Sequence, residues 1–195
     1  MRRSSSPSGA ARGGGRPLSV QAVPAGRPPI SGDELEIEAR LSADLHTDRL
    51  ARTAWPGAPI VSAEVSRVVL DVERDADDAQ EVMAPAGRGM TYRCDRLARP
   101  MRKTLDRGAR DALLNRYYRP QWRRLRDAAG DAVLIDLHSY PRDPWPIEPD
   151  PDAARPEIDL ESSPDLTPRS WVTDLAVHFT ACGYGVGHKT PLAGG

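Results

Sequence analysis

The chain has 195 residues, of which 39% are hydrophobic and 28% charged, and its formal net charge is −1. This size and composition fit one folded domain plus tails. The near-neutral charge argues against a nucleic-acid-binding protein, and no stretch approaches the roughly 20 apolar residues of a membrane span. Cys94 and Cys182 are too few for a disulfide framework. A cytoplasmic protein is therefore the expectation.

The N-terminal part of the chain predicts a tail, a strand and a helix. Residues 1–17 are rich in Ser, Gly, Arg and Pro, and they bury too little apolar surface to offset the entropy of ordering. We expect a disordered tail there and a folded domain over 18–195, which begins with a weak strand at 18–23. Residues 32–50 follow a helical pattern. Its candidate apolar positions are Leu35, Ile37, Leu41, Leu45 and Leu50.

The middle of the chain alternates apolar runs with a long loop. The runs 58–63 and 65–72 predict short strands. The stretch 75–91 is acidic and then Gly-rich, and it predicts a loop. Thr104 is the candidate N-cap of the helix that follows, and Pro120 should kink or divide that helix before it ends near residue 129.

The apolar run Ala132–Leu137 is the segment on which the functional interpretation depends. It lies between Gly130 and Pro141 and predicts a buried parallel strand. Ligands of open α/β sheets collect at the carboxyl ends of strands. The polar residues at this end are Asp136, His138 and Ser139. From the strand alone, His138 is either a metal ligand or a histidine that ends a strand without chemistry.

The C-terminal part predicts irregular chain, then a helix, then a strand. Residues 142–168 are rich in Pro and Asp, and Gly183–Val186 begins the predicted strand. The helix between them spans Pro168–Cys182, with inward side chains at Trp171, Leu175, Val177 and Phe179. Because strands and helices alternate, the fold class is α/β, with a mixed, largely parallel sheet flanked by helices.

Several of these stretches, taken together and in order, resemble the N-formylglutamate amidohydrolase family. The motifs Ser66-Arg67-x-x-x-Asp71-x-x-Arg74 and Asp136-Leu-His-Ser139 carry most of the likeness. The full set of matching stretches is 43–48, 66–74, 87–92, 116–120, 135–139, 155–158 and 190–194. The family's fold is similar to that of the zinc carboxypeptidases, so the resemblance implies a zinc carboxypeptidase/phosphorylase-hydrolase-like fold.

The resemblance also implies a chemistry and assigns residues to it. The reaction is hydrolysis of a small acidic amide, an N-formyl or N-acyl acidic amino acid such as N-formylglutamate, with zinc polarising the carbonyl and activating water. His138 and Asp44 match metal ligands, and Asp136 and Ser139 would orient them. Two arginines match those that hold the substrate carboxylate, namely Arg67 and Arg74.

Several positions depart from the family pattern. The family's first metal-binding His corresponds to Ala25, and Gln121 and Lys189 replace an expected His and Asn. The glutamate expected as general acid/base has no counterpart, so no catalytic residue is assigned and the domain is expected to be C-terminally incomplete. Catalytic zinc normally has three protein ligands. His46 could supply the third only if its helix is irregular, because a regular helix turns it roughly 200° from Asp44.

These departures leave an alternative open. The chain could be a catalytically inactive relative, or a fragment, that keeps an Arg-lined anion-binding pocket. In the purely structural interpretation, Arg67 forms an ion pair with Asp71 or Glu73 and binds no substrate.

Overall fold

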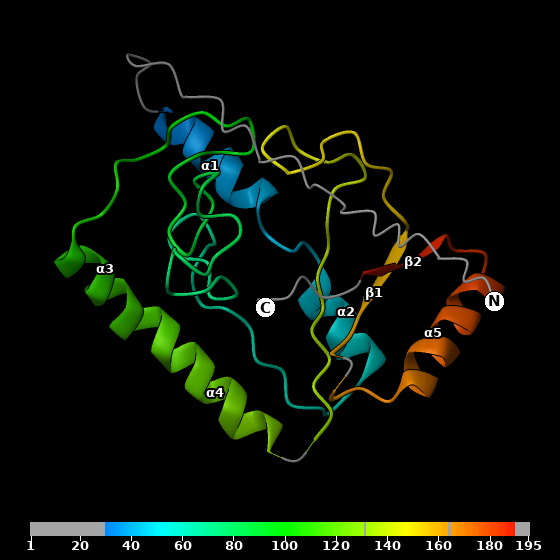
Figure 1. Ribbon diagram of the computed structural model, residues 1–195. Coiled ribbons are helices and arrows are strands. Elements are labelled where there is room, and N and C mark those ends of the chain that lie inside the picture. The colour runs from blue at the N-terminus through cyan, green and yellow to red at the C-terminus, as the bar shows by residue number, and fades with distance from the viewer. Residues whose placement is uncertain (1–29, 131, 164, 190–195) are drawn as a thin grey trace, which may run out of the picture.

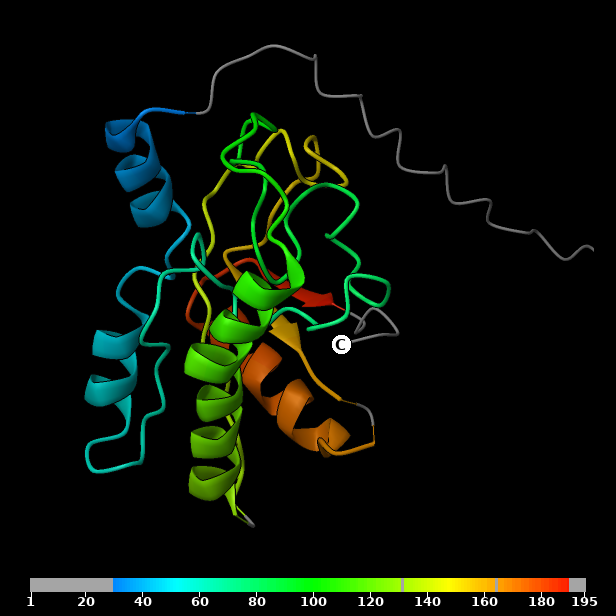
Figure 2. The same ribbon diagram turned by 90° about the vertical axis from the view of Figure 1, so that its left-hand side faces the viewer.

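The computed structural model describes residues 30–130, 132–163 and 165–189. Its elements in chain order are α1 (Gly32–Leu41), α2 (Thr47–Ala54), α3 (Arg107–Leu113), the π-helical turn η1 (Leu114–Tyr118), α4 (Arg119–Ala129), β1 (Ile158–Glu161), α5 (Arg169–Ala181) and β2 (Val186–Lys189). In Figure 1, α3 and α4 lie end to end at one side of the molecule, and α5 lies beside the strands at the other. Looping chain lies between these two sides in the same view, and Figure 2 shows more of it above α3 and α4. The expected tail, the predicted strand at 18–23 and Ala25 lie outside the described residues.

A small parallel sheet gives the fold its α/β character. β1 and β2 pair in parallel, with Ile158 opposite Val186, and α5 is the crossover between them. The predicted C-terminal helix is therefore confirmed, as is the strand that follows Gly183. None of the described helices is both long enough and apolar enough to cross a bilayer.

The three other strands predicted within the described residues are wrong. Residues 58–63 and 65–72 form loops and turns, and Ala132–Leu137 has no strand partner among the described residues. Its apolar side chains are exposed rather than buried, at 61% for Val133, 57% for Leu134 and 54% for Ile135. An apolar run is compatible with a strand, but only a neighbouring strand makes it one.

The core is built on the irregular segment 65–101 and not on the helices. One buried cluster contains Val68, Tyr92 and Met101, and a second contains Leu70, Val72 and Met90. The second cluster also contacts side chains of the long helix, namely Leu113, Leu114, Tyr117 and Tyr118. The backbone N–H of Asp71 donates to Met90 O at 2.8 Å and ties the two halves of this segment together.

The predicted helix at 32–50 is two helices with a break. α1 ends at Leu41 and α2 begins at Thr47. Ser31 caps α1 in a capping box with Glu34, whereas His46 has a left-handed backbone (φ 70°) that turns the chain into α2. The candidate apolar positions of this stretch are exposed: Leu35, Ile37, Leu41, Leu45 and Leu50.

A π-helical turn that ends at Tyr118 divides the helical stretch from Arg107 to Ala129 directly before Pro120, as the sequence predicts. Asp106, and not Thr104, is the N-cap of this stretch, since its carboxylate accepts from Ala109 N at 2.8 Å. The π-helical turn η1 widens the helix just before Pro120. Pro120 then occupies the first turn of α4, directly after this wider turn.

The inward side chains predicted for α5 are mostly wrong. Trp171, Leu175 and Val177 are exposed. Phe179 is half-buried and contacts Tyr184 edge-on, with ring centroids 6.3 Å apart. The reason is that α5 contacts only the short pair β1 and β2 among the described elements, and two short strands cover little of a helix.

Charged side chains, and not the exposed leucines of α1, provide the main anchor of this helix to the core. Glu38 is only 1% exposed. It accepts from Arg88 Nη1 at 3.0 Å and from Arg96 Nη1 at 2.7 Å, and Ser42 Oγ donates to it at 3.1 Å. Arg88 also lies 4.0 Å over the ring of Tyr92. A buried carboxylate is tolerated because it is fully paired.

We expect Glu38→Gln to lower the free energy of unfolding by about 3–5 kcal/mol, because it leaves the buried Arg88 guanidinium without its countercharge. Urea unfolding followed by circular dichroism measures the loss. Glu36→Gln, at an exposed position of the same helix, is the control and should stay within about 0.5 kcal/mol of the parent. Equal stabilities of the two variants would contradict the anchoring role.

Candidate metal centre

Three segments that lie far apart in sequence converge on one cluster of charged side chains. Asp44 comes from the break between α1 and α2, Glu73 from the end of the run 65–72, and His138 from the chain after α4. His138 Nδ1 lies 3.2 Å from Asp44 Oδ2 and 3.6 Å from Glu73 Oε2. One ligand atom from each of the three residues lies within 4.8 Å of the other two. The structure thus brings together both residues that the sequence proposed as metal ligands.

The helix break places Asp44 in this cluster. Thr47 Oγ1 donates to Asp44 O at 3.0 Å and holds the turn that leads into α2. Ser139 N donates to Asp44 Oδ1 at 3.4 Å, so the carboxylate is held by the segment that carries His138. His46, the third ligand considered from the sequence, is exposed and does not belong to the group of Asp44, Glu73 and His138.

Arg67 lies at the centre of the cluster. Its Nη2 atom donates to Asp44 Oδ2 and, at 2.5 Å, to Glu73 Oε2. The same nitrogen lies 3.3 Å from His138 Nδ1. Its other terminal nitrogen, Nη1, lies 3.9 Å from Asp71 Oδ2. The guanidinium therefore contacts all three candidate metal ligands.

Asp71 and Arg74 form a second layer next to Arg67. The Asp71 side chain is completely buried and accepts from the Tyr92 hydroxyl at 2.5 Å. Arg74 Nε lies 3.6 Å from Asp71 Oδ2, and Arg74 Nη1 donates to Glu81 Oε1 at 3.2 Å. Both predicted substrate arginines therefore belong to one network, but each is already paired with carboxylates.

Asp136 fixes the imidazole from the opposite side. His138 Nε2 lies 3.2 Å from Asp136 Oδ2, which leaves Nδ1 directed at Asp44 and Glu73. The hydrogen bond to His138 lowers the pKa of Asp136. A carboxylate on the distal nitrogen of a metal-binding histidine is the usual way to orient that ring.

The charges of the cluster shift several pKa values. Hydrogen bonds to Asp136 and then Asp44 raise the pKa of His138 from 6.5 to about 10, although burial acts in the opposite direction. Burial raises the pKa of Glu73. For Arg67, burial is outweighed by nearby carboxylates, which raise its pKa. Without a metal, the cluster thus holds an imidazolium and a guanidinium among carboxylates at neutral pH.

Sequence reasoning considered Glu73 only as an ion-pair partner of Arg67 and missed it as a possible ligand. The available signal was its position at the carboxyl end of the apolar run 65–72, next to Arg74. Glu73 is recognised as a possible ligand only because His138, some 65 positions further along the chain, lies next to it. A contact between such distant residues leaves no pattern in the local sequence.

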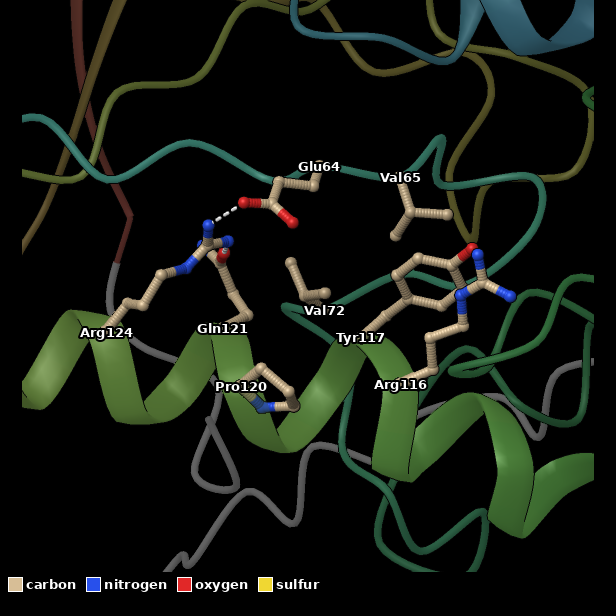
Figure 3. A pocket seen from close by; sticks show the side chains of 8 residues that line it. All are labelled: Glu64, Val65, Val72, Arg116, Tyr117, Pro120, Gln121 and Arg124. Carbon is tan, nitrogen blue, oxygen red and sulfur yellow. Dashed lines mark hydrogen bonds and ion pairs between the residues drawn. The ribbon is translucent and has the colours of Figure 1, made fainter.

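Two hollows in the surface lie outside this cluster. One, of about 10 Å³, lies between the helix η1–α4 and the segment 64–72, where Arg124 forms an ion pair with Glu64 (Figure 3). It has room for about one water molecule and no substrate. The other, of about 380 Å³, is lined by residues 142–144 and 151–155. Neither hollow includes Asp44 or His138 in its lining.

Comparison with known proteins gives one result that bears on this cluster. A family model described as N-formylglutamate amidohydrolase matches residues 20–195. This agrees with the resemblance carried by the sequence motifs. Searches of curated proteins and of solved structures found no match.

We expect His138 in metal-free protein to remain protonated through pH 8 and to titrate near pH 10. Folding raises this pKa, so the protonated His138 side chain stabilises the folded protein. That contribution to the free energy of unfolding is complete below about pH 6.5 and is lost as the pH rises toward 10. NMR titration of the imidazole in the presence of a chelator measures it.

Asp136→Asn should lower this pKa clearly, because it removes the largest cause of the shift. Asp33→Asn, at an exposed position in the first turn of α1, is the control and should leave it unchanged. An imidazole that titrates near 6.5 in the parent protein would refute the ion-paired arrangement.

Proposed function

We propose, from the premise that this chain belongs to the N-formylglutamate amidohydrolase family, that it is a zinc-dependent amidohydrolase. The metal would be held by Asp44, Glu73 and His138. The substrate would be a small acidic amide, an N-formyl or N-acyl acidic amino acid such as N-formylglutamate. The family match supports the reaction class, and the cluster supports the metal.

The convergence of three ligand atoms is the observation that carries the proposal. One imidazole nitrogen and two carboxylate oxygens lie within 4.8 Å of one another. This donor set fits zinc, whose catalytic sites use three protein ligands of these types and leave a fourth position open. Glu73 supplies the third ligand that the sequence did not provide.

The charge balance of the cluster also favours a cation. The carboxylates of Asp44, Asp71, Glu73, Glu81 and Asp136 surround two guanidiniums and one imidazole. Even with the imidazole protonated, carboxylates outnumber positive groups by two. A divalent ion is the kind of ligand that such a surplus attracts, since ions often carry the largest local charge in a site.

Each residue has a role that follows from its contacts. When bound, zinc would polarise the amide carbonyl and lower the pKa of a water molecule. Asp136 orients the His138 ring through Nε2, and the backbone N–H of Ser139 orients the Asp44 carboxylate. Arg67 and Arg74 would bind the substrate's carboxylate, for which the planar guanidinium is well shaped.

An anion-binding pocket without metal is the weaker candidate. Arg67 is already paired with Asp44 and Glu73, and Arg74 with Asp71 and Glu81. An anion would have to displace these carboxylates before either guanidinium could bind it. The displaced carboxylates would then need another positive charge, such as that of a metal ion, to pair with.

We expect the purified chain to bind about one zinc ion and, when loaded, to hydrolyse N-formylglutamate. His138→Ala should weaken zinc binding by at least about 100-fold, because changes to residues that only orient ligands already cost 10–100-fold. Competition with a chromophoric chelator measures the affinity, and release of formate measures turnover.

The matched control is His178→Ala, at an exposed position of α5, which should leave both affinity and turnover unchanged. Zinc binding that survives His138→Ala would refute the proposed centre. Zinc binding without turnover would support the metal centre but refute the proposed hydrolase activity.

A further inference from the structure

We infer that Arg67 and a metal ion compete for the same ligand atoms, so that metal loading releases the Arg67 guanidinium for the substrate. This inference rests on the proposed function, because it concerns the same centre. It goes further by predicting that metal binding and carboxylate binding are thermodynamically linked through one side chain.

The geometry excludes simultaneous occupancy. Arg67 Nη2 contacts Asp44 Oδ2 and Glu73 Oε2 and lies 3.3 Å from His138 Nδ1. These are the same atoms that face one another in the cluster. Zinc binds carboxylate oxygens at about 2.0–2.2 Å and imidazole nitrogen at about 2.0–2.1 Å. An ion at that distance from all three would overlap the guanidinium nitrogen and repel its charge.

A second carboxylate is ready to receive the displaced guanidinium. Arg67 Nη1 already lies 3.9 Å from the buried Oδ2 of Asp71. Asp71 is fixed by the Tyr92 hydroxyl and by its own side-chain bond to Glu73 N at 3.1 Å. Rotation of the Arg67 side chain toward Asp71 would keep the guanidinium paired while it leaves Nδ1 of His138 free.

The exchange has a consequence for substrate binding. In the metal-free arrangement, Arg67 uses its Nη2 donors on Asp44 and Glu73 and has few left for a substrate carboxylate. Once a metal replaces it, those donors become available next to the metal. A carboxylate ligand that binds Arg67 also removes the competitor of the metal. By linkage, each ligand must then raise the affinity of the other by the same factor.

The first experiment compares zinc affinity in the parent, Arg67→Met and Arg107→Met, measured by chelator competition at fixed pH and ionic strength. Arg67→Met removes the competing charge while it keeps side-chain length, and it should bind zinc at least about tenfold more tightly than the parent. Arg107 is almost fully exposed on α3, so Arg107→Met should match the parent.

The outcomes separate the two proposals. Zinc binding that is equal or weaker in Arg67→Met overturns the competition and leaves the metal centre in place. An absence of zinc binding in both the parent and Arg67→Met overturns the metal centre and the competition together. Cooperative unfolding of Arg67→Met, followed by circular dichroism, establishes that the comparison is made between folded proteins.

A second measurement uses the parent protein and does not depend on any variant. Glutarate, a small dicarboxylate, should tighten zinc binding at least about fivefold, the lower end of typical coupling between sites. Titration of zinc into glutarate without protein corrects for their direct association. No change in zinc affinity would overturn the inference, as would a coupling that persists undiminished in Arg67→Met.

Discussion

The buried carboxylate of Asp71 links the apolar core to the charged site. Its chain neighbours on either side belong to one core cluster, while its own oxygens bind the Tyr92 hydroxyl and face Arg67 and Arg74. An ionised group removed from water costs several kcal/mol unless it is paired. The two arginines are therefore drawn toward Asp71, and the site inherits its position from the core. Burial of Leu70 and Val72, on either side of Asp71, fixes where its carboxylate lies.

In this protein, buried ion pairs hold segments together that apolar helix faces would hold together in other small domains. α1 meets the core through the ion pairs of Glu38 with Arg88 and Arg96 and through Ala39, while its leucines are exposed. Such pairs add little net stability compared with an apolar contact of similar size, but they are costly to break. They also demand specific geometry, and this explains how the segment 65–101 can be well defined without helices or strands. The price is sensitivity to any change that removes one partner.

The sequence predicts local features of this protein better than it predicts pairing. The helix 169–181 and the strand after Gly183 follow from local patterns, and both are present. Among the described residues the run Ala132–Leu137 has no strand partner, because pairing depends on a distant neighbour that the run itself does not encode. The proximity of Asp44 and His138 came from a family resemblance and not from periodicity. Glu73 joins the group through tertiary contact with His138, so its position after the run 65–72 did not suffice to identify it.

The segment that carries His138 shows why a metal would matter to the fold as well as to the chemistry. Its apolar residues 133–135 are exposed and contribute little burial. The contacts that hold the imidazole run to charged groups, chiefly Asp44 and Asp136. Bonds of this kind are partly screened by salt and water. An ion that binds Asp44, Glu73 and His138 together would join three separate segments by stronger bonds, and its binding energy would then appear as folding energy.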